Sequence, residues 1–327
     1  MKIHHFFKIV LYLSASIFLG VQTNLIYAQD ATKTTKIIVP FAAGGSTDII
    51  ARILNERLST SLKQSVIVEN RLGAGGTVGT MLVTKAPPDG STLLLTSVTT
   101  ASIAYSLYPN LQYDLKKDLE PVAVVGSVPM ILLVSNNLPV KSLQELLVYA
   151  KNNPGKLTYG SAGNGTAPHL AGELFKRMAN IDIVHIPYKG NSLALNDLMG
   201  GHLNLMFDFL PSSIQLVKGN KVNALAISSP KRSSLLPNIP TMTEAGLKDY
   251  SVLSYFGIFA PAKTPKAIIN SLNTSINQIT MSPQIQEKFN EAGIEPTAES
   301  VQWFNEYLSE EIDRWAKVIK AGNVKAE

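Results

Sequence analysis

Two glycine turns in this sequence join a strand to a helix, a position where backbone N–H groups can hold an anion. In the first turn, an apolar run ends at Val39, and Gly44 and Gly45 precede Ser46 and Thr47. The glycines let the backbone approach a ligand closely, and the hydroxyls add donors, one of which can cap the helix. The unpaired N–H groups and the helix dipole favour negative charge at one point. Because no lysine stands in the loop, a carboxylate fits better than a triphosphate.

A related turn follows Leu157–Gly160 and leads into a helix that begins near Pro168. Gly163 and Gly165 free the backbone there, and the polar side chains are those of Ser161, Asn164 and Thr166. Proline suits a helix start because the N–H that it lacks would have no partner. Two anion-binding turns far apart in the sequence, with no catalytic motif between them, indicate a clamp on a ligand rather than an enzyme.

Nucleotide binding and serine hydrolysis are disfavoured by the spacing of the relevant residues. Gly73, Gly75 and Gly76 follow a strand, but Val78 stands where a dinucleotide fingerprint needs its third glycine. We interpret this segment as a tight turn beside the cleft. Neither a Walker loop nor a Gly-x-Ser-x-Gly elbow is present.

Histidines and acidic residues offer no complete metal site. His169 and Glu173 are spaced to share a helix face, but there is no His-Glu-x-x-His pattern. His185 and His202 adjoin strands and are interpreted as structural residues. Asp208 ends a predicted strand, and two interpretations remain open: its carboxylate faces the cleft, or it caps the strand end.

Composition excludes several classes of function. The 327 residues have a net charge of +5, and their basic residues are scattered rather than gathered into a nucleic-acid footprint. There is no cysteine, which excludes disulfides, thiolate metal sites, a cysteine nucleophile and lipid attachment through an N-terminal cysteine. We therefore expect neither a metal nor a nucleic-acid partner, and no cofactor is indicated.

The N-terminal region, 1–28, has the pattern of a secretory signal peptide. Lys2 and Lys8 supply positive charge, an apolar run covers 9–21, and Ala28 precedes the expected cleavage point. The alternative is an uncleaved N-terminal anchor. No later segment is apolar enough over a sufficient length to span a membrane. We expect export to a bacterial periplasm, with no lipid anchor on the mature protein.

Strand and helix patterns alternate along the rest of the chain. Strands are predicted at 37–39, 66–68, 92–96, 122–127, 130–134, 158–160, 182–186, 203–207 and 224–228. Helices are predicted at 47–62, 142–152, 168–178, 191–199, 211–218, 265–279, 282–292 and 301–321, besides a short one ending at 85. This pattern predicts an α/β fold with mostly parallel sheets flanked by helices. With no soft linker, two domains would be joined by more than one chain crossing, which permits hinged closure.

Several motifs, in this order, resemble those of the tripartite tricarboxylate transporter receptors, also called Bug-type solute-binding proteins. They are VPFAAGGSTDIIAR at 39–52, VENRLGAGG at 68–76, PPDG at 87–90, GSAGNGTAPHL at 160–170, HIPYKG at 185–190 and DLMGGHLNLMFD at 197–208. The resemblance covers essentially the whole mature chain. It implies a two-lobed periplasmic binding protein with lobe one at 29–127 plus 251–327 and lobe two at 128–250.

The resemblance also implies a ligand and the residues that bind it. Family members bind small carboxylates, including dicarboxylates, tricarboxylates, acidic amino acids and aromatic acids, and pass them to membrane transporter subunits. Carried over to this sequence, the binding residues are Phe41, Ala43, Gly44, Ser46 and Thr47 from lobe one, with Ser161, Gly163, Gly165 and Thr166 from lobe two. Thr99 and Asp208 complete the expected set, Thr99 where the family often places a polar contact. The alternatives are a sensor that presents its ligand to a signalling protein and a carboxylate-acting enzyme, although no general base is evident.

Overall fold

A computed structural model describes residues 34–322 and 324–325. The predicted signal peptide at 1–28 lies outside the described residues. The strands are β1 Thr34–Val39, β2 Ser65–Asn70, β3 Thr92–Ser97, β4 Leu119–Val134, β5 Thr158–Ser161, β6 Val184–Pro187, β7 Leu205–Phe209, β8 Asn223–Ile227, β9 Leu253–Pro261 and β10 Glu295–Pro296. The helices are α2 Ser46–Leu62, η2 Ala74–Gly76, α3 Thr77–Thr84, α4 Val98–Leu107, α5 Leu115–Asp118, α6 Leu143–Asn152, α7 Ala167–Ala179, α8 Asn191–Gly200, α9 Leu210–Lys218, α10 Lys266–Thr280, α11 Pro283–Glu291 and α12 Val301–Gly322.

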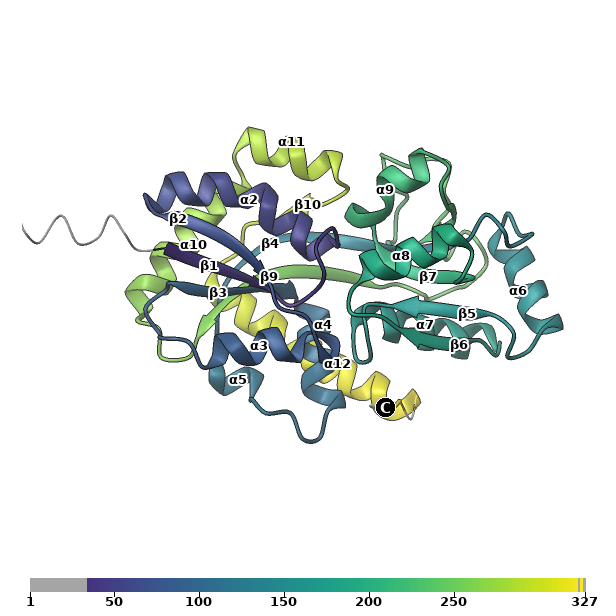
Figure 1. Ribbon diagram of the computed structural model, residues 1–327, viewed down its shortest axis with the longest axis horizontal. Coiled ribbons are helices and arrows are strands. Elements are labelled where there is room, and N and C mark those ends of the chain that lie inside the picture. Colours follow the sequence, from purple (N-terminus) through teal and green to yellow (C-terminus); the bar gives the residue numbers. More distant parts are fainter. Residues whose placement is uncertain (1–33, 323, 326–327) are drawn as a thin grey trace, which may run out of the picture.

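The strands form two sheets, each flanked by helices, which lie side by side along the long axis of the molecule (Figure 1). The first sheet has the order β2-β1-β3-β9-β4, with β10 also on β4, and we call it with its helices the first half. The second has the order β4-β7-β5-β6, with β8 also on β4, and forms the second half. Parallel pairs lie at β1, β2 and β3 and at β5, β6 and β7. Antiparallel pairs involve β4 and β9, so the predicted α/β fold is confirmed with mixed sheets.

Strand β4 belongs to both sheets. Its residues Leu119–Pro129 pair with β9, and from Met130 onward it pairs with β7 and β8. The sequence predicts two strands here, because Pro129 lacks an N–H and commonly interrupts a ladder. In the structure that proline stands where β4 changes partners, so the strand continues without a break.

The second crossing between the halves runs from β8 to β9, and Ser228 ties it to the first crossing. The Ser228 hydroxyl accepts from Met130 N at 2.8 Å and donates to the Val252 carbonyl at 2.5 Å. The Ser228 N–H donates to the Met130 carbonyl at 2.7 Å. This serine is 1% exposed, so the two crossing segments are held together by a buried hydroxyl.

Two elements next to the cleft have no clear signal in the sequence. Helix α4 is buried on nearly every side and therefore shows no amphipathic period. Strand β9 is an apolar run with a central glycine, Gly257, and is recognised only by its pairing with β3 and β4. By contrast, α2 carries the expected apolar stripe, in which Ile50, Leu54 and Leu58 are buried.

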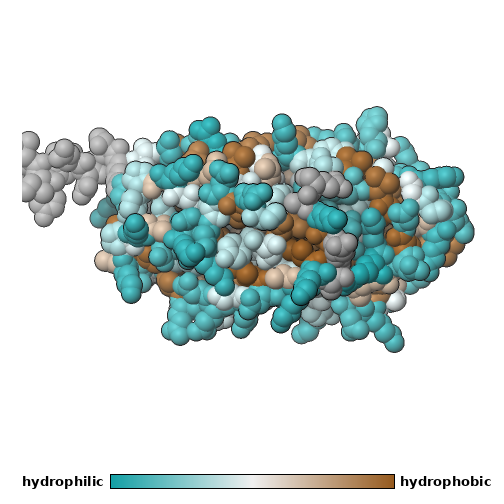
Figure 2. Space-filling model, turned by 90° about the horizontal axis from the view of Figure 1, so that it is seen from below, coloured by the Kyte–Doolittle hydropathy of each residue, from teal (hydrophilic) through white to brown (hydrophobic). Residues whose placement is uncertain are grey.

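The exterior is mainly hydrophilic, and on the face seen in Figure 2 the apolar side chains gather toward the middle. Helices α7 and α12 meet at a surface hollow that includes Leu170, Leu174 and Val318. Among the described residues, none of the helices combines the length and the apolar character needed to cross a membrane.

Candidate functional site

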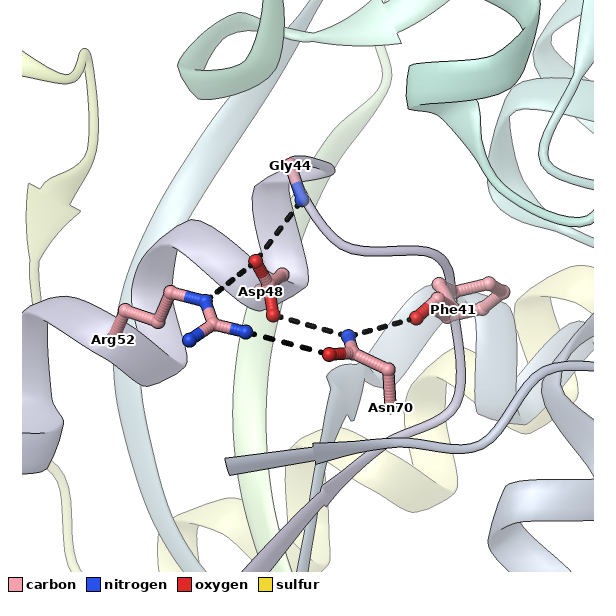
Figure 3. A network of polar contacts seen from close by, with 5 residues as sticks. All are labelled: Phe41, Gly44, Asp48, Arg52 and Asn70. Carbon is pink, nitrogen blue, oxygen red and sulfur yellow. Dashed lines mark hydrogen bonds and ion pairs between the residues drawn. The ribbon is translucent and has the colours of Figure 1, made fainter. Parts of the chain in front are cut away.

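The first glycine turn is braced by Asp48 in the first turn of α2 (Figure 3). Asp48 Oδ2 accepts from Gly44 N at 3.0 Å and from Arg52 Nε at 2.8 Å, and Asp48 Oδ1 accepts from Asn70 Nδ2 at 3.0 Å. Asn70 Nδ2 also donates to the Phe41 carbonyl at 3.0 Å. These contacts attach both ends of the turn to one carboxylate. Burial alone would raise the pKa of Asp48, but the hydrogen bonds from Arg52, Gly44 and Asn70 outweigh it and hold the pKa below its usual value.

The second turn is held by bonds within itself and to two histidines. Thr166 Oγ1 donates to the Gly163 carbonyl at 2.7 Å, and Gly163 N donates to Ser161 Oγ at 3.1 Å. Gly165 N donates to His169 Nδ1 at 3.1 Å, which requires that nitrogen to be unprotonated. These bonds within the turn and to His169 give it a fixed shape.

His185 supports the same turn from β6. Its Nε2 lies 2.7 Å from Ser161 Oγ, and its ring stacks on His169 with centroids 4.1 Å apart. Burial, together with the nearby charges of His169 and Lys176, lowers the pKa of His185 to about 3. His185 is therefore neutral near neutral pH and serves as a structural support of the turn. In the described part of the chain, no group of three or more histidine and acidic side chains is placed to hold a metal ion.

A small cavity lies between the two turns, where the halves meet. Its lining residues are Phe41, Gly45, Ser46, Thr47, Ser97, Thr100, Ala162, Thr166, Pro168, Asn191 and Phe209. All except Phe41 and Ala162 occupy an N-cap or first-turn position of α2, α4, α7, α8 or α9. Five helix N-termini therefore converge on one space, and among the described residues no charged side chain lines it. Helix N-termini favour negative charge, so the cavity has the electrostatic character of an anion site.

Direct hydrogen bonds join the halves around this cavity. Ser46 Oγ lies 2.9 Å from Ser212 Oγ, and Ala167 N donates to Thr100 Oγ1 at 3.1 Å. The Tyr108 hydroxyl donates to the Asn164 carbonyl at 2.8 Å. The cavity is about 20 Å³, room for about one water molecule. A dicarboxylate could enter only if the halves moved apart.

Several of the predicted site residues line this cavity and others do not. Phe41, Ser46, Thr47 and Thr166 line it. Ser161, Gly163 and Gly165 do not line the cavity but take part in the hydrogen bonds that hold the second turn. Ala43 and Gly44 are exposed residues of the first turn. Thr99, which is expected to face the ligand, does not line the cavity in this structure. Its hydroxyl donates to Glu311 Oε2 at 2.8 Å on the side of α12, because the segment is helical and turns it away.

Asp208 is fully buried within β7 and does not line the cavity. It does not cap the strand end, since the strand continues to Phe209, and its carboxylate contacts the side chains of Ser212 and Asn191 rather than the cavity. Its Oδ2 accepts from Ser212 Oγ at 2.6 Å, and its Oδ1 accepts from Asn191 Nδ2. Burial raises the pKa of Asp208 to about 6, against the opposing effect of the bonds from Ser212 and Asn191.

Seven lining residues were not among the predicted site residues. Gly45, Ala162 and Pro168 belong to the two predicted turns, whereas Ser97, Thr100, Asn191 and Phe209 lie outside them. Ser97 caps α4 by accepting from Thr100 N at 3.1 Å, so recognition of this helix would have placed both residues. Asn191 follows Gly190 directly after the HIPYKG motif, and a helix start beside a glycine was the available signal.

Comparison with known proteins matches residues 50–324 to the tripartite tricarboxylate transporter family receptors. The chain belongs to this family. Among solved structures, this receptor is similar to the periplasmic binding protein BugD, at 36% identity and a TM-score of 0.86 over 90% of this chain and 99% of that one. It is similar to Rpa4515 of R. palustris with adipate, at 36% identity and a TM-score of 0.87 over 89% and 98%. It is also similar to MatC of Rhodopseudomonas palustris with bound malate, at 31% identity and a TM-score of 0.84 over 88% and 98%.

Family membership settles the class of the protein. The receptor belongs to a family of periplasmic solute-binding proteins rather than to a family of enzymes. Its fold is that of BugD.

Proposed function

We propose that this receptor captures a small carboxylate between its two halves and delivers it to a tripartite tricarboxylate-type transporter. The observation that carries the proposal is the convergence of five helix N-termini on a cavity in which none of the described lining residues is charged. Each N-terminus stabilises a negative charge by about 0.3–1 kcal/mol at an exposed site and by up to about 2 kcal/mol when partly buried. The relatives seen with adipate and malate support a dicarboxylate as the ligand.

Two bodies would close on this ligand. Lobe one comprises 29–127 with 251–327, and lobe two comprises 128–250. They rotate about the crossings joined by Ser228, and the contacts of Ser46 with Ser212 and of Thr100 with Ala167 form on closure. The closed shape is what the membrane subunits of the transporter recognise.

The ligand carboxylate would lie against the first turn of α2 and the start of α7. Ser46 and Thr47 donate to it, Thr166 lines the same space, and Phe41 packs on its carbon chain. The mature protein acts in the periplasm after removal of residues 1–28.

A panel of mono-, di- and tricarboxylates and acidic amino acids tests this proposal. A ligand at a hundred times its Kd stabilises the folded protein by about 2.7 kcal/mol, which raises Tm by several degrees. We expect at least one dicarboxylate to do so. Thr47→Val should weaken that ligand by about tenfold, as for one lost hydrogen bond. Thr60→Val, an exposed position on the same helix, serves as the control. A melting curve that no acid shifts would refute the proposal.

A further inference from the structure

Asn191 has an unusual position in the cavity wall. It is the first residue of α8, is 6% exposed and lines the cavity. Its Nδ2 donates to Asp208 Oδ1, whereas its Oδ1 is buried and has no hydrogen-bond partner among the described residues. A buried acceptor without a partner is costly, so in a native protein it calls for an explanation, and at a cavity wall a bound water or ligand group supplies one.

Asp208 determines which way this amide faces. Its carboxylate is fully buried and receives Ser212 Oγ on one oxygen and Asn191 Nδ2 on the other. An ionised carboxylate can only accept hydrogen bonds, so the NH₂ group of the asparagine must face it. The amide oxygen is then the polar group of Asn191 that remains for the cavity.

We propose that Asn191 is a specificity-determining acceptor, positioned by Asp208, and that the preferred ligand carries a hydroxyl or ammonium donor besides its carboxylate. This inference rests on the proposed function. A site built to accept a hydrogen bond discriminates against an analogue that lacks the donor, because its own polar group then stays unpaired. A plain methylene at this point leaves Asn191 Oδ1 without a partner.

Matched pairs of acids isolate the effect of a single hydroxyl. The probes are succinate with malate, glutarate with 2-hydroxyglutarate and adipate with 2-hydroxyadipate, each measured by calorimetry. In the pair whose chain length fits best, we expect the wild-type protein to bind the hydroxy acid about tenfold more tightly, or better. Asn191→Ala should bring the two affinities of the pair to within about twofold. Asn196→Ala, an exposed asparagine on the same helix, should keep the wild-type ratio.

Asp208→Asn gives a second, directional test. An amide at 208 presents an NH₂ group, so Asn191 can turn its oxygen toward 208 and its own NH₂ toward the cavity. We expect the preference to move toward the plain acid by about tenfold or more, while the total charge of the ligand is unchanged. If this variant fails to fold, Asn191→Ala still decides the question.

The outcomes separate this inference from the function on which it rests. If both members of a pair bind equally to the wild-type protein, the inference is overturned and the receptor remains a carboxylate binder. If Asn191→Ala leaves the wild-type ratio unchanged, the inference is overturned as well. If none of the six acids and no other acid of the panel binds, the proposed function fails and the inference fails with it.

Discussion

Replacing Asp48 by asparagine removes the charge that braces the first turn while keeping the size of the side chain. Asp48 is 3% exposed and receives three donors. The amide oxygen of the variant can still accept from Gly44 N and Arg52 Nε, but its NH₂ group then opposes Asn70 Nδ2. One buried hydrogen bond, to Asn70, is therefore lost, and the bond from Gly44 loses its charge assistance.

The magnitude follows from these two losses. A neutral hydrogen bond contributes about 0.5–1.5 kcal/mol and one to a charged group about 1.5–3 kcal/mol. Arg52 is more than half exposed, so solvent screens its share of the loss. Together the two losses lower the free energy of unfolding by about 2 kcal/mol. This corresponds to a decrease in Tm of about 4–8 °C.

Urea denaturation at neutral pH measures this change as a shift of the midpoint without a change of slope. The control is Asp114→Asn, because Asp114 also caps a helix, and asparagine caps as well as aspartate does. The pKa of Asp48 is lowered, so its contribution is present above pH 3.8 and is lost as the pH falls further. The difference between wild type and variant should shrink in that range. A midpoint for Asp48→Asn equal to that of Asp114→Asn would refute this reasoning.

Two further predictions concern the contact between the halves and the response to pH. Alanine at Gly75 would place its Cβ 2.2 Å from the Asn164 carbonyl oxygen, so small-angle scattering should show the halves further apart than in the wild type. The control is Gly155→Ala, which has a similar positive φ away from the contact and should have the wild-type radius of gyration. Equal radii of gyration for all three proteins would exclude the effect. The pKa of His185 is lowered to about 3, so the stability that its neutral form contributes is lost as the pH falls below 6.5. The pKa of Asp208 is raised to about 6, so the stability that its protonated form contributes is lost as the pH rises from 3.8 through 6. In urea titrations across this range, His185→Gln should reduce the loss of unfolding free energy at low pH, and Asp208→Asn should reduce its loss as the pH rises toward 6. Wild-type pH profiles in both variants would show that neither group titrates as inferred.

The sequence predicts both glycine turns because their signals are local. Glycines, hydroxyls and a following apolar stripe stand within a few residues of each other, and α2 forms as that pattern predicts. Thr99 and Thr100 are an example of a feature that the local sequence does not predict. Which of two adjacent threonines faces the cavity depends on whether the segment is extended or helical, and a helix buried on nearly every side leaves no periodic signal to decide it.

Pairing between distant residues sets the rest of the site. Asp208 and Asn191 lie 17 positions apart, and nothing in either segment indicates that one orients the other. Likewise, β4 is a continuous strand because partners from far along the chain, β7, β8 and β9, take up its ladder on both sides of Pro129. Such features arise from tertiary packing and become visible only in the folded chain.

The ring of helix starts around the cavity bears on how receptors of this kind can diverge. Main-chain N–H groups are present whatever side chain a position carries. Substitutions of the side chains that line the cavity can therefore change its shape while its attraction for a carboxylate is retained. One nutrient can then be exchanged for another in small steps, with no intermediate that has lost all affinity. A pocket built on one lysine lacks this latitude, because a single codon change there abolishes the charge on which recognition depends.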